Sequence, residues 1–417
     1  MNYWIITYGC QMNKSDSERI AQVLESVGYQ PTQKINEADL IVVNMCSVRQ
    51  SAVDRVYGLI PKFDKLEAKT ILTGCILPKD KKKFAERFDY ILNIKELAKW
   101  PKILNINTSL FHDREKMKDK DYLEIEPKNL YNFTGFVPIM TGCNNFCAYC
   151  VVPYVRGREI SRPAEEIVCE VKKLVKRGSK EIWLLGQNVN SYTNVPFPQL
   201  LRKVNDIPGK FWIRFTSSHP KDFSDELIYA MAESGKVTEY LNLPVQSGDN
   251  EILKKMNRPY TISHYKNLVK KIRKKIPNIA LSTDVIVGFP GETKKQFENT
   301  ANLFKEIKFD MAYIAEYSPR FGTVAAKLKD DVPQEEKNRR EKVLTEILKE
   351  TALLNNKRYT DKETEVFIDN CKNNNIWFGK TRTHKTVKIE SEKNLLGKFV
   401  KVKITDALPW GLRGEIK

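Results

Sequence analysis

Two kinds of hydrophobic periodicity alternate along the first hundred residues. Short apolar runs, such as "YWIITYGC" and "ADLIVVNMC", are separated by segments with helical spacing, such as "DSERIAQVLESVGYQ". The runs "KTILTGC" and "DYILNI" continue the series. Apolar strands that alternate with amphipathic helices are typical of βαβ units and a parallel sheet. We therefore predict a parallel α/β domain over residues 1–104.

A longer α/β series follows. Residues 105–134 carry mixed charges and little periodicity, which predicts a linker. Helical patterns then cover 163–177, 222–234, 261–275, 293–307 and, with many charges, 333–357. The predicted strands between them are "FVPIMTG", "EIWLLGQ", "FWIRFTS", "YLNLPVQ", "IALSTDVIVG" and "DMAYIAEYS". Six such units over residues 135–357 favour an open or closed α/β barrel.

The last sixty residues change period. The segments "TEVFIDNCK", "IWFGKTRTHKTVKIE", "GKFVKVKITDAL" and "LRGEIK" alternate apolar and polar positions. Alternation of this kind in short, closely spaced strands predicts a small all-β barrel of the oligonucleotide-binding kind over residues 358–417.

The charge adds a partner to this picture. The formal net charge is +18, and residues 355–417 hold 14 Lys and Arg against 8 Asp and Glu. A basic chain favours an acidic partner, nucleic acid first, although a solvated lysine-rich surface gives the same balance. No apolar run approaches the roughly 18 residues of a membrane helix. The start of the chain lacks the features of a signal peptide, so we expect a cytoplasmic protein.

Three cysteines end predicted strands of the first domain. Cys10, Cys46 and Cys75 stand at the carboxyl ends of "YWIITYGC", "DLIVVNMC" and "TILTGC". Parallel α/β folds place ligands at this edge, and neighbouring strands would bring the three thiols together. Each cysteine alone is equally compatible with a small buried hydrophobic residue. Three in the same topological place favour a metal site, because cysteines of large cytosolic chains serve metal or redox chemistry.

A second triplet follows the first strand of the central domain. Cys143, Cys147 and Cys150 form a C-x3-C-x2-C motif, with no histidine or further cysteine within eighteen residues. A structural zinc or an ordinary iron–sulfur cluster needs four protein ligands. A half zinc ribbon completed from elsewhere is an alternative, but its knuckles have a different spacing. A cluster held by three thiolates instead leaves one iron open for chemistry. Cys169, Cys371 and the four histidines are interpreted as structural.

The motifs resemble a known family. C-x3-C-x2-C after the first barrel strand, with Tyr149 before the last cysteine, resembles the radical S-adenosylmethionine (SAM) superfamily. "GCQMN", "NMCSVR" and "TGC" resemble the N-terminal domain of its methylthiotransferases, and "CVVPYVRGREISRP", "LLGQNVNSY", "FTSSHP", "LPVQSGD" and "DVIVGFPGET" resemble the MiaB branch. The tail is similar to a TRAM domain. Val155 and Arg158 depart from the Thr and Glu of the family's "TRGEE" motif.

The resemblance implies a fold, two cofactors and a reaction. The fold is α/β: a parallel N-terminal domain, a radical-SAM partial TIM-type barrel and an all-β TRAM barrel that binds RNA. The enzyme replaces the C2 hydrogen of N6-isopentenyladenosine at position 37 of tRNA with a methylthio group and consumes two SAM. One 4Fe–4S cluster, on Cys143, Cys147 and Cys150, acts with SAM to generate a radical. A second, on Cys10, Cys46 and Cys75, carries the sulfur. No catalytic side chain beyond these ligands is expected.

Further residues are assigned by the same resemblance. Tyr149 would line the SAM adenine, and other SAM contacts would come from Gln187, Ser217, Gln246 and Gly288. Gly288 is equally compatible with a simple strand-to-helix turn. In the tail, Trp377, Arg382 and Lys385 are the candidates for stacking on RNA and for phosphate contact. The expected partners are the anticodon arm of tRNA and an electron donor such as flavodoxin or ferredoxin, with the enzyme a monomer and no membrane involved.

Three alternatives remain open at this point. One is the sister methylthiotransferase that acts on N6-threonylcarbamoyladenosine in tRNA, and another modifies an aspartate of a ribosomal protein. The third is a zinc-dependent RNA-binding protein without catalysis. Iron content separates the last from the others.

Overall fold

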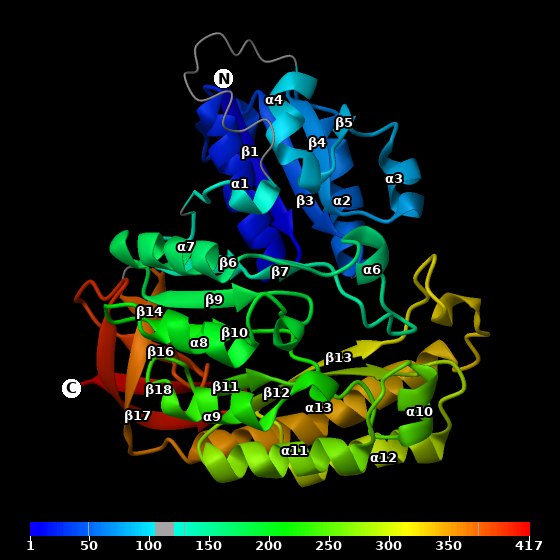
Figure 1. Cartoon of the computed structure of the whole chain (residues 1–417), viewed down its shortest axis with the longest axis vertical. Coiled ribbons are helices and arrows are strands. Elements are labelled where there is room, and N and C mark those ends of the chain that lie inside the picture. The colour runs from blue at the N-terminus through cyan, green and yellow to red at the C-terminus, as the bar shows by residue number, and fades with distance from the viewer. Residues whose placement is uncertain (49, 105–120, 129, 374) are drawn as a thin grey trace. The chain divides into compact units, whose positions relative to one another are not determined.

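The computed structural model describes residues 1–48, 50–104, 121–128, 130–373 and 375–417. Most of the predicted linker therefore lies outside the described residues. The chain divides into two compact units (Figure 1). The first contains 1–131, 136–144 and 150–160, and the second contains 132–135, 145–149 and 161–417. The segment after the C-x3-C-x2-C motif thus belongs to the N-terminal unit.

The first unit is built on a five-stranded parallel sheet with the strand order β2-β1-β3-β4-β5. Its strands are β1 (Asn2–Tyr8), β2 (Gln30–Pro31), β3 (Leu40–Cys46), β4 (Lys69–Cys75) and β5 (Tyr90–Ile91). Its helices are α1 (Gln11–Ser26), α2 (Gln50–Phe63), α3 (Pro78–Phe84) and α4 (Trp100–Ile103). The predicted parallel α/β fold of this part of the chain is confirmed, and its predicted bounds, 1–104, stay a prediction.

The central strand β3 shows why this sheet forms. All seven of its residues are buried. Leu40 and Val42 belong to one hydrophobic cluster, whereas Ile41, Val43 and Met45 belong to another. Because successive side chains of a strand point to opposite faces, both faces of the sheet are covered, and a continuous apolar run is the expected sequence of such a strand.

Four short elements carry the chain between the two units. They are β6 (Thr134–Pro138), β7 (Met140–Thr141), α6 (Val152–Val155) and β8 (Ile160–Ser161). β6 begins in the second unit, where it is the edge strand of a sheet with the order β10-β9-β6, and it ends in the first unit.

The second unit holds the predicted barrel in two parallel sheets. One is the sheet that β6 borders, and its other strands are β9 (Glu181–Leu185) and β10 (Trp212–Phe215). The other contains β11 (Tyr240–Asn242), β12 (Ala280–Val287) and β13 (Met311–Glu316). A parallel bridge between Ile213 and Val237 links β10 to the residues just before β11. The helices are α7 (Ala164–Lys176), α8 (Phe197–Asn205), α9 (Asp225–Glu233), α10 (Asn250–Lys255), α11 (Ile262–Lys275), α12 (Lys294–Ile307) and α13 (Gln334–Lys357).

Every predicted strand of this series is present. Among the described residues of this series, three helices were not predicted: α6 with 4 residues, α8 with 9 and α10 with 6. Helices this short repeat their apolar face too few times to give a clear period, and most of their stability comes from tertiary packing.

The tail forms a closed five-stranded barrel, as predicted, with the order β14-β15-β16-β18-β17. Its strands are β14 (Glu363–Lys372), β15 (Ile376–Thr381), β16 (Thr386–Glu390), β17 (Phe399–Leu408) and β18 (Gly411–Ile416). The alternating apolar residues fill its core, including Val366, Val387, Ile389, Val402 and Ile404. Within the described residues, no helix has the length and apolar content that crossing a membrane would take.

Candidate cluster and cofactor sites

The strand order brings the three N-terminal cysteines to one edge. β1, β3 and β4 are consecutive neighbours in the sheet. Cys46 and Cys75 are directly opposite each other in the register, and Cys10 lies two residues beyond Tyr8, which pairs with Met45. Spacings of 36 and 29 residues in the chain thus converge at the carboxyl edge. The predicted placement of these thiols is confirmed, and their role as cluster ligands stays a prediction.

The thiols of this triplet interact with one another. A hydrogen bond with Cys75, followed by burial and by the nearby Cys75 and Cys10, raises the pKa of Cys46 well above its usual value. The same hydrogen bond lowers the pKa of Cys75 to about 7, with a further lowering by Arg156. Burial raises the pKa of Cys10. Three thiols at one sheet edge supply the ligand type that iron–sulfur clusters take, so the donor set fits such a cluster by its placement.

The turns at this edge are fixed by small and polar residues. Gly74 has φ +104°, and a Cβ there would lie 2.3 Å from the backbone oxygen of Met45. Asn13 and Asn44 are both buried and bond to each other, with Asn13 Nδ2 donating to Asn44 Oδ1 at 2.8 Å. Asn13 Oδ1 also accepts from the backbone N–H of Cys10 at 3.3 Å. These contacts explain why "GCQMN" and "NMC" carry Asn beside Cys.

Two charged residues at this site were missed from the sequence. Arg156 Nε donates to Cys75 Sγ at 2.9 Å, and its Nη2 donates to Asp16 Oδ2 at 2.7 Å. Both side chains are buried. Arg156 stands six residues after Cys150, inside "YVRGRE". The only signal was its presence in a motif, because nothing local shows that this arginine returns to the N-terminal sheet.

The residues of the C-x3-C-x2-C loop are divided between the two units, and each part has hydrogen bonds within its own unit. In the first unit, Cys143 N donates to Gly157 O at 3.2 Å. In the second unit, Arg258 Nη1 donates to Cys147 Sγ at 3.6 Å, and Arg258 Nη2 bonds to Pro244 O at 3.0 Å. Each cysteine triplet therefore has one thiol that accepts from a buried arginine.

Neither triplet forms the kind of site that a single ion requires. Across the described part of the chain, no three or more His, Cys, Asp and Glu side chains are grouped to hold one metal ion. The cysteines of a 4Fe–4S cluster bind separate irons, so they stand farther apart than the ligands of one ion.

A set of unpaired polar atoms marks the ends of β9 and β10. Gln187 Oε1, Asn188 Oδ1, Ser218 Oγ and His219 Nε2 are buried and have no hydrogen-bond partner among the described residues. Asn190 ties the two loops together by accepting from the backbone N–H of His219 at 2.8 Å. Buried polar groups are normally satisfied, so these atoms fit a polar ligand such as SAM at the carboxyl ends of the strands.

Two other predicted SAM residues also follow strands, Ser217 after β10 and Gln246 after β11. Ser217 has φ +67° and Gln246 has φ +68°. Non-glycine residues in this left-handed region are uncommon and cluster at functional sites. Tyr149 packs against a hydrophobic cluster that includes Phe289 of the loop after β12. SAM contact by these residues stays a prediction.

Gly288 has a structural explanation in the same loop. Its φ is +68°, and a Cβ there would lie 2.4 Å from Cγ of Lys337. Its N–H donates to Glu292 Oε2 at 2.6 Å. The turn and this close approach account for the glycine, so contact with SAM remains a prediction that no contact of Gly288 supports.

His219 was interpreted as structural from the sequence, and its Nε2, unpaired among the described residues, makes it a further functional candidate. Its Nδ1 accepts from the backbone N–H of Lys221 at 3.2 Å, which leaves the proton on Nε2. Burial, together with the charges of Arg258 and Lys221, lowers its pKa to about 2. His219 is therefore a neutral ring that presents an unpaired N–H donor.

The three residues predicted to bind RNA all have protein partners. Trp377 is buried and donates to Ser391 O at 2.9 Å. Arg382 bonds to both carboxylate oxygens of Glu239, and Lys385 pairs with Asp310 at 2.7 Å. Trp377 belongs to the core of the tail barrel, whereas Arg382 and Lys385 hold the barrel on the residues around β11 and β13. Their contact with RNA stays a prediction, and these partners argue for other residues.

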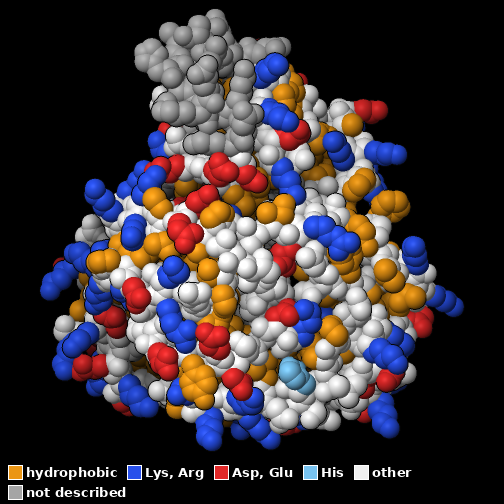
Figure 2. All heavy atoms as spheres, in the orientation of Figure 1, with side chains coloured by type: hydrophobic (Ala, Val, Ile, Leu, Met, Phe, Trp, Pro, Cys, Tyr) orange, Lys and Arg blue, Asp and Glu red, His pale blue; other side chains and the backbone are white. Residues whose placement is uncertain are grey.

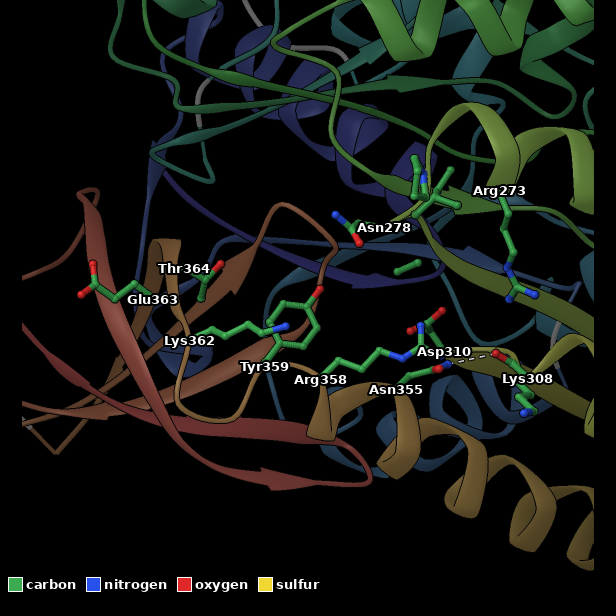
Figure 3. Close-up of a pocket in the computed structure, with 13 residues that line it drawn as sticks. Arg273, Asn278, Lys308, Asp310, Asn355, Arg358, Tyr359, Lys362, Glu363 and Thr364 are labelled. Atoms are coloured by element: carbon green, nitrogen blue, oxygen red, sulfur yellow. Dashed lines mark hydrogen bonds between the residues drawn. The ribbon is translucent and has the colours of Figure 1, made fainter.

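The pocket drawn in Figure 3 lies away from the carboxyl ends of the strands, where the predicted SAM residues stand. It encloses about 350 Å³ and is lined by Ala280, the first residue of β12, and by Asp310, which precedes β13. It therefore opens at the amino ends of the strands, opposite to the edge where α/β folds bind ligands. Arg273 in its wall donates to Ile307 O at the end of α12 at 2.7 Å. This arginine therefore caps the carboxyl end of a helix, where a positive charge is favourable.

Family models match three parts of the chain. Residues 2–94 match the uncharacterized protein family UPF0004, residues 137–304 match the radical SAM superfamily, and residues 357–417 match the TRAM domain. The radical SAM match implies SAM and a 4Fe–4S cluster.

Solved structures show the same fold at low identity. A radical SAM methyltransferase, TsrM from Kitasatospora setae, covers 78% of this chain and 77% of its own, with a TM-score of 0.53 and 15% identity. The radical SAM enzyme OxsB with aqua-cobalamin and SAM covers 84% of this chain and 56% of its own, with a TM-score of 0.52 and 12% identity.

Curated relatives match almost the whole chain. Proteins named tRNA-2-methylthio-N(6)-dimethylallyladenosine synthase from Caldicellulosiruptor saccharolyticus and Clostridium botulinum are 45% identical over 99% of this chain and 92% and 96% of their own. One from a Thermoanaerobacter species is 42% identical over the same share of this chain and 92% of its own. The chain therefore belongs to the family of tRNA-2-methylthio-N(6)-dimethylallyladenosine synthases.

Proposed function

We infer that the protein is a tRNA methylthiotransferase that replaces the C2 hydrogen of N6-isopentenyladenosine at position 37 with a methylthio group. The observation that carries this inference is the identity of 42–45% to enzymes of that name over 99% of the chain. The three motif-bearing regions agree with it, because each matches one part of such an enzyme.

The chemistry explains why cysteines dominate the site. The C2 hydrogen of an adenosine is neither acidic nor attached to an electrophilic carbon, so a positioned acid or base cannot remove it. When bound, a 4Fe–4S cluster with SAM supplies the radical chemistry that the side chains lack. The chain holds the cluster through Cys143, Cys147 and Cys150. The unpaired polar atoms after β9 and β10, His219 Nε2 among them, orient the bound SAM.

A second cluster on Cys10, Cys46 and Cys75 is part of the proposal. Three thiols at one sheet edge, one of them with a pKa of about 7, support cluster binding with one iron left open for sulfur. Cys46 and Cys75 are buried, so water has little access to their thiolates. The products of two SAM molecules, one cleaved and one demethylated, would accompany each methylthio group.

RNA contact is assigned to the outer face of the tail barrel. Phe378, Lys388 and Arg413 are register partners on the adjacent strands β15, β16 and β18, so their side chains form one row. Phe378 and Lys388 are half-buried and Arg413 is exposed. Lys388 pairs with Glu390 at 2.7 Å, but this carboxylate is largely exposed, unlike Asp310, the partner of Lys385. An aromatic ring beside two cations suits stacking on a base with phosphate contacts nearby. Net charge alone does not locate this site, since Figure 2 shows Lys and Arg spread over the drawn face among acidic side chains.

The proposal includes two partners of the enzyme itself. A flavodoxin or ferredoxin would supply the electron, and the chain would work as a monomer. Neither follows from a contact in the chain; both come from the resemblance of the motifs to the family.

Mass spectrometry of tRNA nucleosides tests the function. Cells that lack the protein should lose 2-methylthio-N6-isopentenyladenosine and accumulate N6-isopentenyladenosine, and the gene restored in trans should reverse both changes. Loss of the methylthio group from N6-threonylcarbamoyladenosine instead would assign the protein to the sister enzyme. Unchanged tRNA together with loss of the methylthio group from a ribosomal-protein aspartate would assign it to the enzyme that modifies that aspartate.

A further inference from the structure

The guanidinium of Arg156 joins the N-terminal thiols to a buried carboxylate. Its Nε donates to Cys75 Sγ at 2.9 Å, its Nη2 to Asp16 Oδ2 at 2.7 Å and its Nη1 to the Tyr122 hydroxyl at 3.4 Å. The side chain of Arg156 is 5% exposed and that of Asp16 is fully buried. A planar fork that reaches two partners in fixed directions is a property of arginine and not of lysine.

The backbone around Arg156 is held as firmly as its side chain. Lys95 Nζ donates to Arg156 O at 2.7 Å, and Gly157 O accepts from the backbone N–H of Cys143 at 3.2 Å. Gly142 has φ +80°, and a Cβ there would lie 2.0 Å from the backbone oxygen of Arg158. The segment that follows the radical-SAM motif is therefore fixed in the N-terminal unit, and Arg156 is not a mobile surface cation.

The charges at this site nearly balance without the thiols. Asp16 neutralises Arg156, and a buried pair of this kind is retained at a cost in desolvation that packing with apolar residues would avoid. The pair therefore calls for an explanation other than stability. The hydrogen bond from Arg156 Nε to Cys75 Sγ offers one, because Asp16 then holds the guanidinium in the orientation that this bond needs.

We propose that Arg156 is a positioning residue for the N-terminal cysteine triplet, which holds Cys75 Sγ and raises the reduction potential of the cluster on that triplet. The proposal rests on the second cluster of the proposed function. Hydrogen bonds to cluster sulfurs and nearby positive charge favour the reduced, more negative state. The loop that follows the radical-SAM cysteines would thus set the electronic state of the auxiliary site.

The test uses the full-length chain with Cys143, Cys147 and Cys150 replaced by Ala, so that only the N-terminal triplet binds iron. In this parent we compare Arg156→Gln, Arg156→Lys, Asp16→Asn and, as a matched control, Arg158→Gln, which changes an exposed arginine two residues along. After anaerobic reconstitution, iron and sulfide are measured, and the cluster is titrated against redox mediators and followed by visible absorption and electron paramagnetic resonance. Circular dichroism checks the fold of each variant.

The expected shifts differ in sign. Arg156→Gln should lower the reduced-to-oxidised ratio at a fixed potential about tenfold, which is 59 mV for a one-electron couple. Arg156→Lys should lower it less, because the charge stays but the fork is lost. Asp16→Asn should raise it, since the guanidinium charge is no longer balanced. Arg158→Gln should leave it unchanged. Loss of iron from a folded Arg156→Gln chain that Arg156→Lys restores would also support the positioning role.

Two results would overturn the proposal, and they differ. Full iron content with the same potential in the parent, Arg156→Gln and Arg156→Lys would remove Arg156 from the site while leaving the second cluster in place. A parent with Arg156 intact that binds no iron would instead contradict the second cluster itself, and with it this part of the proposed function.

Discussion

Arg382 binds the carboxylate of Glu239 with three hydrogen bonds, from Nε to Oε2 at 2.8 Å and to Oε1 at 3.1 Å, and from Nη2 to Oε1 at 2.9 Å. Arg382 of the basic tail therefore binds the residue that directly precedes β11. Its neighbours agree, because Arg214 of β10 donates to the backbone oxygens of Thr381 and Arg382 at 2.9 and 2.8 Å. The tail barrel and the central sheet are therefore stabilised by the same residues that a charge-based interpretation would give to RNA.

Removal of the Arg382 side chain should mainly reduce stability. Arg382→Ala leaves Glu239 half-buried without its cation and should cost about 1 to 2 kcal/mol of unfolding free energy. Denaturant unfolding measures this loss. Binding of tRNA at a temperature where the variant is folded should keep its salt dependence, and a flatter salt slope for Arg382→Ala would return this residue to the RNA surface. Point variants are preferred to deletion of the tail, which would strip partners from buried Arg214.

Substitutions in the row of Phe378, Lys388 and Arg413 on the outer face of the barrel should reduce tRNA binding and leave stability unchanged. Arg413→Gln and Lys388→Gln should each weaken tRNA binding and lower the slope of log K against log salt by about 1, because each removes one phosphate contact. The unfolding free energy should stay within about 0.5 kcal/mol of the parent. Electrophoretic mobility shifts over a salt series measure the slope. If a variant with both substitutions keeps the salt slope of the parent, RNA binds another face of the protein.

The radical-SAM triplet should control SAM cleavage. The parent chain should bind about eight irons after anaerobic reconstitution, and replacement of Cys143, Cys147 and Cys150 with Ala should leave about half of them. The variant should form no 5′-deoxyadenosine from SAM and dithionite, measured by liquid chromatography. Reductive cleavage that persists in the triple variant would show that this loop has been assigned wrongly.

The N-terminal cysteine triplet should not be needed for SAM cleavage. Cys46 and Cys75 end β3 and β4, and Cys10 lies two residues after β1, so all three come from the N-terminal sheet and not from the C-x3-C-x2-C loop. Their replacement with Ala should therefore leave SAM cleavage in place while abolishing 2-methylthio product on an isopentenyladenosine tRNA. Product analysis by mass spectrometry tests this, with the parent as the positive control. Methylthiolated nucleoside from the Cys10, Cys46 and Cys75 variant would contradict the division of labour between the clusters.

Acid should destabilise the protein through His219. Its pKa of about 2 lies below the ordinary 6.5, so below pH 6.5 the unfolded chain takes up a proton that the folded chain does not. This histidine therefore costs about 1.4 kcal/mol of unfolding free energy per pH unit below that point. His219→Asn keeps an acceptor for the N–H of Lys221 and should flatten the pH dependence between 6.5 and 5 by this amount. Denaturant unfolding at several pH values measures it, and an unchanged slope would show that His219 is protonated in the fold.

Local periodicity determined most of the architecture. Strands and helices follow from residues close in the chain, so the parallel N-terminal sheet, the six strands of the barrel and the alternating strands of the tail were all predicted. The position of Cys46 and Cys75 at the ends of their strands was equally local. Once parallel strands neighbour, their carboxyl ends share an edge, and the convergence of these thiols follows.

Local alternation also held information that charge obscured. Along β15 every second residue is buried, and Trp377 shares the inward side with Gly379 and Thr381. The outward side belongs to Phe378 and Lys380. The period of the strand therefore predicts a core tryptophan, and the aromatic ring available to RNA is its neighbour.

Only the tertiary structure decided which distant residues meet. Arg156 reaches Asp16 across 140 positions of the chain, and Arg382 reaches Glu239 across 143. Such contacts depend on the order of the strands and on the path of the connecting loops, which no local pattern encodes. A basic residue reads the same in sequence whether it binds a phosphate, a carboxylate or a cysteine sulfur; its partner is fixed by the fold, because burial permits a charge only where an opposite group is already in place.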